Sequence, residues 1–155
     1  MMPKRPDLSK QDPEVGALNF MKYLGVDYGT KRIGLAVSDD DGSMAFPYTV
    51  VPNRGIMHAA DDIIMACQNK NIEAIVIGES LTYALTDNPI MKHIRKLEQH
   101  LKEKIKLPIY FEDETLSSAH AEREQGKNEM LDASAAAIIL TSFLDKQKHK
   151  NTTSP

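Results

Sequence analysis

Two short apolar runs, residues 73–78 (EAIVIG) and 107–111 (LPIYF), constrain the fold of this chain more than any other feature. Each is nearly free of polar residues, the pattern of a strand buried on both faces of a parallel sheet. Between them, residues 89–106 have apolar side chains at helical spacing, after Asn88 as an N-cap and Pro89 at the first helical position. A strand, a helix and a strand in this order predict a right-handed βαβ unit.

The segment before this unit has a different pattern. Residues 23–27 and 33–37 are short apolar runs joined by a polar turn that contains glycine, which predicts a β-hairpin. Residues 45–51 form a third predicted strand, and Pro47 places it at a sheet edge or at its own start, because proline cannot donate to a strand ladder. Apolar residues at helical spacing predict a helix over residues 56–69.

Two more helices are predicted near the end of the chain. One begins at Ser117 or Ser118 and ends near residue 125, and the other covers residues 131–146. The order β-β-β-α-β-α-β-α-α predicts an α/β fold, in which a mixed sheet, an antiparallel meander plus parallel strands, has helices on both faces. Right-handed crossovers bring the carboxyl ends of the first, fourth and fifth strands to one rim, where open α/β sheets bind ligands.

One domain is expected, because 155 residues are enough for a single core. Residues 1–21 have three prolines and mixed charges without a period, so we expect a disordered lead-in. Residues 22–146 form the domain, and residues 147–155 form a predicted disordered basic tail. No run reaches the ~18 apolar residues of a membrane span. The N-terminus has no apolar signal-peptide core, and a cytoplasmic location is expected.

Cysteine content and charge exclude some classes of site. Cys67 is the single cysteine, which excludes an intramolecular disulfide and a cysteine-based metal cluster, and its apolar surroundings predict a buried thiol. Residues 22–145 carry 13 Lys and Arg against 19 Asp and Glu, a net charge of −6. This balance argues against attraction of nucleic acid to the whole surface, although it leaves a local basic patch open.

The predicted helix over residues 89–106 carries such a candidate patch. Five cations lie off its apolar stripe: Lys92, Arg95, Lys96, Lys102 and Lys106. The interleaved Glu98 and Glu103 favour an ordinary solvated face. His93 and His100 lie seven residues apart on the same helix, and without a third ligand we expect them to be surface residues rather than a metal site.

Acidic residues fall at the strand ends that this topology brings to one rim. Asp27 ends the first strand, Glu79 follows the fourth, Asp113 and Glu114 follow the fifth, and Asp132 opens the last helix. Carboxylates without cysteine or paired histidine suit a hard cation, Mg²⁺ or Mn²⁺. Phosphodiester hydrolysis uses such ions to clamp the phosphate and activate a water.

Each acid alone has an ordinary explanation. Asp132 suits the first turn of a helix through the helix dipole. Asp27 is as well explained as a turn former, and Glu79 as a solvated side chain. Only the joint placement of these residues predicts an acidic site at the sheet rim.

The segment GVDYGTKRIG (residues 25–34) is the most informative stretch of the sequence. Gly29 lets the backbone approach a metal ion or a phosphate closely. Thr30, Lys31 and Arg32 at the tip of the turn can contact a phosphate backbone. The alternative is an ordinary hairpin with a charged tip.

Four segments carry a resemblance to a known family: GVDYGTKRIGLAVSD (25–39), IVIGESL (75–81), EDETLSSAHAE (112–122) and DASAAAIIL (132–140). In order and spacing they resemble the YqgF/RuvX family of RNase H-like nucleases, described as Holliday junction resolvases and as pre-16S rRNA processing nucleases. The first and last segments are specific, and the middle two are degraded. The resemblance covers about residues 22–145.

The resemblance implies an RNase H-like fold and a specific set of site residues. Asp27, Glu114 and Asp132 would hold Mg²⁺ or Mn²⁺, with Asp113 beside them. The implied partner is nucleic acid, either pre-rRNA or branched DNA, bound by a monomer or a homodimer.

This chain departs from the family at two positions of the predicted site. The family commonly has Asp-Glu-Arg where this chain has Asp113-Glu114-Thr115, so a cation beside the acids is lost. The family commonly has Gly-Leu-Pro-Leu where this chain has Gly78-Glu79-Ser80-Leu81. The second departure adds an acid, and Glu79 is a candidate further ligand.

The connection between Glu114 and Asp132 is a third departure. It spans 18 positions and has Lys127 as its sole lysine, whereas the family has a longer, basic segment. Because phosphate affinity depends on the available cations, we expect weak, salt-sensitive substrate binding. His120 follows Glu114 by six residues and is a candidate for proton transfer.

The main functional hypothesis is a metal-dependent nuclease that hydrolyses phosphodiester bonds in structured nucleic acid, by processing the 5′ end of pre-16S rRNA or by resolving Holliday junctions. The alternative is a non-catalytic RNase H-like module that binds nucleic acid or a protein. Asp-x-Gly-Thr followed by a basic residue also resembles the phosphate loop of actin-like kinases and chaperone ATPases. Those need a second lobe, for which about 125 ordered residues leave no room.

Overall fold

The computed structural model describes residues 21–79, 89–113 and 129–153, and in these ranges it has one five-stranded sheet and three helices. The strands are β1 (Tyr23–Tyr28), β2 (Arg32–Ser38), β3 (Ala45–Pro52), β4 (Ala74–Glu79) and β5 (Ile109–Asp113). The helices are α2 (Ile56–Lys70), α3 (Pro89–Lys104) and α5 (Glu129–Thr153). The predicted lead-in up to residue 20 and the predicted helix over residues 117–125 lie outside the described residues.

The strand order is β3-β2-β1-β4-β5, which confirms the predicted mixed sheet. β1 pairs antiparallel with β2 and parallel with β4, and β4 pairs parallel with β5. β3 is an edge strand, as Pro47 predicted. Because β1, β4 and β5 are parallel, their carboxyl ends lie at the same rim of the sheet.

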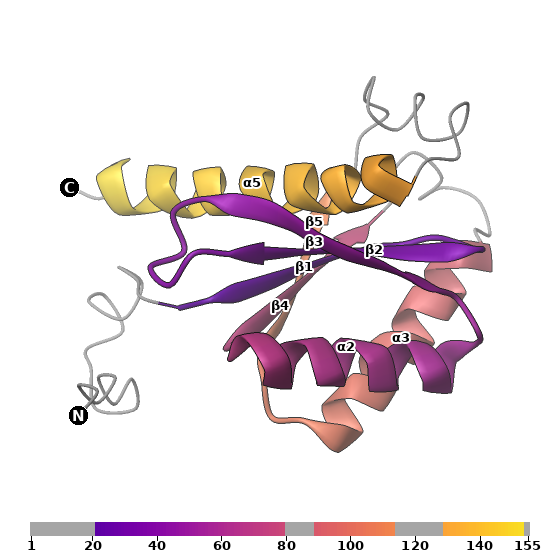
Figure 1. Cartoon of the computed structure of the whole chain (residues 1–155). Coiled ribbons are helices and arrows are strands. Elements are labelled where there is room, and N and C mark those ends of the chain that lie inside the picture. Colours follow the sequence, from indigo (N-terminus) through magenta and orange to yellow (C-terminus); the bar gives the residue numbers. More distant parts are fainter. Residues whose placement is uncertain (1–20, 80–88, 114–128, 154–155) are drawn as a thin grey trace.

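The helices cover the sheet in two layers. α2 and α3 lie against one face and α5 lies against the other, so the sheet is the middle layer (Figure 1). Residues of β1 alternate between the layers: Leu24, Val26 and Tyr28 belong to the core under α2 and α3, whereas Gly25 meets α5. This alternation decides which strand-end side chains can meet.

Helix α5 lies unusually close to β1, because Gly25 has no side chain. A Cβ atom at Gly25 would lie 2.9 Å from Leu140 Cβ and 3.0 Å from the Ala136 carbonyl oxygen. At the other end of β1, the Tyr23 ring packs edge-on against Phe143, with 5.5 Å between the ring centroids. These contacts show that α5 runs antiparallel to β1, so its N-terminal half approaches the carboxyl end of that strand.

A buried carboxylate fixes the other half of α5 to the sheet. Glu112 in β5 is 3% exposed, and its Oε2 atom accepts hydrogen bonds from Ser142 Oγ and Lys146 Nζ, both at 2.7 Å. The hydrogen bond to Glu112 raises the pKa of Lys146. The C-terminal half of α5 is therefore held on the sheet by this ion pair as well as by apolar packing.

Two predicted boundaries are corrected by the structure. α5 continues to Thr153, so residues 147–153 are helical rather than the start of a disordered tail. Lysines favour the C-terminal turns of a helix, and Lys148 Nζ donates to the Ser43 carbonyl oxygen at 2.7 Å. β5 begins and ends two residues later than predicted, because its pairing with β4 continues as far as Asp113.

Cys67 is buried in α2, as predicted, and desolvation raises the pKa of its thiol to about 12. A thiol of this kind is a packing group and not a nucleophile at neutral pH. Among the described residues, no helix combines the length and apolar character needed to cross a membrane.

Candidate active site

Asp27 is a buried acid at the rim. It is the penultimate residue of β1 and is 2% exposed, and its Oδ1 atom is inaccessible to solvent. By strand alternation it lies on the same face as Gly25, which is the α5 face. A carboxylate desolvated in this way is a strong electrostatic partner for a cation.

Glu79 and Asp113 lie at the same rim but on the opposite face. They are the last residues of β4 and β5 and are direct partners in the parallel register. Alternation places them with Ile77 and Phe111, which pack in the core under α2 and α3. The sequence predicted that both acids follow their strands, and the structure corrects this, because both end them.

The remaining acids are placed only in part. Asp132 lies in the first turn of α5, and its side chain is not described. Glu114 and His120 lie outside the described residues. Within residues 21–79, 89–113 and 129–153, no group of three or more His, Cys, Asp and Glu side chains is arranged to hold a metal ion.

Asn53, which follows β3, holds the turn between β1 and β2 through hydrogen bonds. This residue was not identified from the sequence. Asn53 Nδ2 donates to the Gly29 carbonyl oxygen at 2.8 Å, and the Asn53 backbone nitrogen donates to the Lys31 carbonyl oxygen at 2.9 Å. Asn53 Oδ1 accepts from the Gly55 nitrogen at 3.0 Å. One side chain therefore ties the predicted substrate-binding turn to the start of α2.

Gly29 is required by the shape of this turn, and we expect Gly29→Ala to destabilise the protein by about 1–3 kcal/mol. An added Cβ would lie 2.5 Å from the Arg32 carbonyl oxygen, a backbone atom that cannot rotate away. Urea unfolding measures the effect. Thr30→Ala is the matched control, because Thr30 is exposed in the same turn, and its cost should stay within about 0.5 kcal/mol. Equal costs would mean that the turn adjusts freely.

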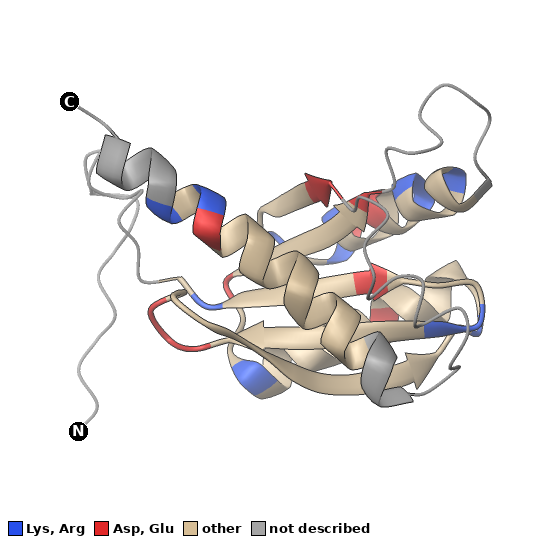
Figure 2. Ribbon diagram, turned by 90° about the horizontal axis from the view of Figure 1, so that it is seen from above, with Lys and Arg blue, Asp and Glu red and all other residues tan. Residues whose placement is uncertain are grey.

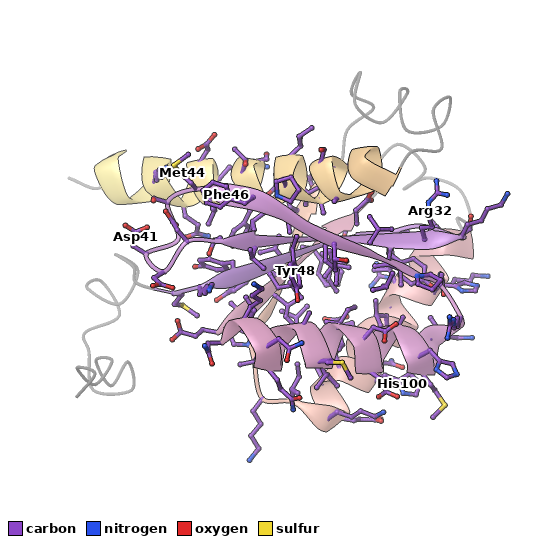
Figure 3. The ribbon with its side chains drawn as sticks, viewed as in Figure 1. Arg32, Asp41, Met44, Phe46, Tyr48 and His100 are labelled. Atoms are coloured by element: carbon purple, nitrogen blue, oxygen red, sulfur yellow. The ribbon has the colours of Figure 1, made fainter. Side chains whose placement is uncertain are left out.

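One group of basic residues lies at the rim end of the molecule (Figure 2). Lys31 is exposed in the turn between β1 and β2, and Arg32 begins β2 at the same end of the sheet (Figure 3). The exposed Lys92, Arg95 and Lys96 occupy the first half of α3, which lies at the same end. Asp41 lies at the opposite end of the sheet (Figure 3).

The second half of α3 contributes less positive charge. Lys102 Nζ pairs with Glu98 at 3.0 Å, and Lys104 Nζ pairs with Asp61 of α2 at 2.9 Å. The predicted solvated face is therefore accurate for this half. The net basic part of α3 is its N-terminal half, beside the rim.

The comparisons with known proteins agree with this architecture. Residues 21–146 match the family model described as "RuvX: Holliday junction resolvase". A protein of Nitratidesulfovibrio vulgaris strain Miyazaki F, named "Putative pre-16S rRNA nuclease", is 37% identical over 144 residues, which cover 85% of this chain and 99% of that protein. A protein of the same name from Maridesulfovibrio salexigens is 36% identical over 132 residues, 80% of this chain and 98% of that protein.

Two solved structures share the fold. Thermus thermophilus RuvC in complex with a Holliday junction substrate has a TM-score of 0.54 at 16% identity and covers 83% of this chain and 96% of that one. The fowlpox virus Holliday junction resolvase has a TM-score of 0.51 at 12% identity, covering 84% and 99%. The likeness confirms the predicted RNase H-like fold.

Proposed function

Because this chain belongs to the RuvX family of Holliday junction resolvases, we propose that it is a nuclease that hydrolyses phosphodiester bonds in structured nucleic acid with Mg²⁺ or Mn²⁺. The first substrate to test is the 5′ end of pre-16S rRNA, which is in the name of its relatives, and the proposed location is the cytoplasm, where ribosomes form. The second is a four-way DNA junction, which is in the description of the family.

The packing of α5 on β1 carries this proposal. Gly25 meets Ala136 and Leu140, and Asp27 lies two residues further along the same face of β1. In an antiparallel helix, the turn before Ala136 is the one that approaches Asp27, and that turn contains Asp132. The close approach thus supports a site in which carboxylates from the first strand and the last helix share one ligand.

The donor set fits a hard cation. Asp27, Glu114 and Asp132 would hold the ion, because carboxylate oxygens are the ligands that Mg²⁺ and Mn²⁺ prefer. The bound ion would supply charge to stabilise the phosphate and would lower the pKa of a water. Burial of Asp27 excludes competing solvent on the inner side of the site.

The other rim residues would position the substrate. Lys31 in the turn and Arg32 at the start of β2 would contact phosphates of the substrate strand through their positive charge. Asn53 holds this turn in place and so acts as a positioning residue. Glu79 and Asp113 lie on the far face, and we give them a supporting role at the rim.

Cleavage assays test the proposal. We expect cutting of a pre-16S rRNA 5′ fragment or of a four-way junction with Mg²⁺ or Mn²⁺, and a loss of at least ~100-fold when the ions are chelated, since metal ions supply several kcal/mol of stabilisation. Activity should return when either ion is restored. Protein that carries Asp27→Asn and is purified in parallel controls for contaminating nucleases.

The non-catalytic module stays the second candidate, favoured by Thr115 and by the excess of acids over bases in residues 22–145. It would show itself as binding to both substrates without cleavage at any metal concentration. That outcome would contradict the nuclease proposal directly.

A further inference from the structure

A pocket of about 330 Å³ opens at the rim, on the sheet face that α2 and α3 cover. It is lined by Tyr28, Thr30, Asn53, Gly55, Ile56, Ile90 and His93. These residues come from the end of β1, the turn after it, the start of α2 and the start of α3. The volume is at the lower end of the ~300–1,000 Å³ typical of small-ligand sites, and it suits a single ring system.

We propose that this pocket binds one unstacked base of the substrate strand, beside the proposed cleavage site; the inference rests on the proposed nuclease function. Unpaired bases are recognised by stacking on aromatic rings and by hydrogen bonds to their edges. The lining provides both, since Ile56 and Ile90 give apolar walls, Tyr28 and His93 give rings, and Asn53 gives a polar edge.

Asn53 is suited to contact a base edge because its amide is held in one orientation. Its Nδ2 donates to the Gly29 carbonyl oxygen at 2.8 Å, and its Oδ1 accepts from the Gly55 nitrogen at 3.0 Å. An asparagine amide has two donor hydrogens and two acceptor lone pairs. These two bonds leave one donor and one acceptor on the same planar group, the pair that can match a base edge.

The charge around the pocket favours a nucleotide over a neutral apolar ligand. Gly55 begins α2 without a side-chain capping bond, and the first turn of that helix has no acidic residue. The positive end of the α2 dipole therefore lies at the pocket. Arg54 and Lys92 are exposed next to lining residues, and Lys31 is exposed in the adjoining turn.

The pocket and the proposed cleavage site flank the same strand end. Tyr28 directly follows Asp27, and alternation sends their side chains to opposite faces of β1. A strand of nucleic acid that crosses the rim can therefore place a phosphate at Asp27 and a neighbouring base in the pocket. The base would fix the register of the scissile phosphate.

Titration of the full chain with adenosine 5′-monophosphate, followed by backbone and methyl NMR, tests the pocket directly. We expect shifts at Thr30, Ile56 and Ile90 at millimolar nucleotide, and none at these residues with ribose 5-phosphate, which has the same charge and no base. Equal shifts with both ligands would show that the pocket binds the phosphate and not the base, which would contradict the proposal. An absence of shifts with the nucleotide would overturn the proposal.

A pair of histidine variants adds a matched comparison. His93→Ala removes an exposed ring that lines the pocket, whereas His100→Ala removes the same ring two turns further along α3 (Figure 3). We expect the first to weaken binding of the mononucleotide about 5- to 10-fold, as expected for a lost stacking partner, and the second to leave it unchanged. Equal affinities of the two variants would contradict the role of His93.

Cleavage kinetics separate this proposal from the nuclease proposal. If the nucleotide binds in the pocket but neither nucleic acid is cut, the nuclease function fails and the pocket's role in cleavage fails with it. If cutting occurs and His93→Ala raises KM without lowering kcat, both proposals are supported. Cutting with the same KM in His93→Ala as in the unmodified protein would overturn the pocket and leave the nuclease intact.

Discussion

Replacing Asp27 by asparagine is expected to lower the rate of cleavage at least ~1,000-fold, because it removes a carboxylate ligand from the proposed site, where a bound ion would supply several kcal/mol. The substitution keeps the size and shape of a side chain that is 2% exposed. We therefore expect the variant to remain folded, with a cooperative thermal unfolding transition. Single-turnover cleavage and thermal unfolding on one preparation measure both effects.

Substitutions of two other acids serve as controls for this result. Asp113→Asn alters an acid at the same rim but on the opposite sheet face, and we expect a loss of less than ~10-fold. Asp40→Asn alters an exposed acid far from the rim, paired with Lys22 at 3.7 Å, and should leave cleavage unchanged. If Asp113→Asn were as damaging as Asp27→Asn, the assignment of the site to the α5 face would be wrong.

Gly25→Ala is expected to cost about 1–3 kcal/mol of stability and to reduce cleavage by about 100-fold in protein that is still folded. The added methyl group would lie 3.0 Å from the Ala136 carbonyl oxygen, so the backbone of α5 must move away from β1. That movement would carry Asp132 away from Asp27. Urea unfolding gives the stability, and cleavage well below the melting temperature gives the activity.

Leu140→Ala separates the two consequences. It removes apolar atoms from the same contact, where Leu140 is fully buried, and should lower the free energy of unfolding by about 2–5 kcal/mol. Unlike Gly25→Ala, it adds no atoms between β1 and α5. We expect the folded fraction of this variant to retain activity. If both variants lost activity in proportion to stability alone, the spacing between β1 and α5 would not matter for catalysis.

The fold could be predicted in outline because its signals are local. The apolar runs, the helical spacing of α2 and α3 and Pro47 at the edge of β3 all depend on neighbouring residues in the chain. The boundaries of β5 and α5 depend on distant partners instead. β5 extends because it pairs with β4, and α5 extends with Lys146 bound to Glu112 and Lys148 bound to Ser43.

The sequence predicted a set of acids at one rim of the sheet, but it did not predict that these acids lie on opposite faces of the sheet. Whether Asp27 and Asp113 meet depends on the exact last residue of each strand, because a shift of one residue reverses the face. Asn53 carried a weak signal, since Pro52-Asn53-Arg54-Gly55 is typical of a turn. Nothing in the sequence indicated that its amide binds the turn at Gly29.

The position of α5 in the chain determines when the proposed site can form during synthesis. Synthesis proceeds from the N-terminus, and β1, with Asp27, is made before the helix that carries Asp132, which follows all five strands of the sheet. A growing chain can pair β1 with β2 and β3 before the 25-residue helix α5 is available to dock on them. In the proposed site, the carboxylates of β1 and α5 would therefore meet only after α5 has been made and has docked on the sheet.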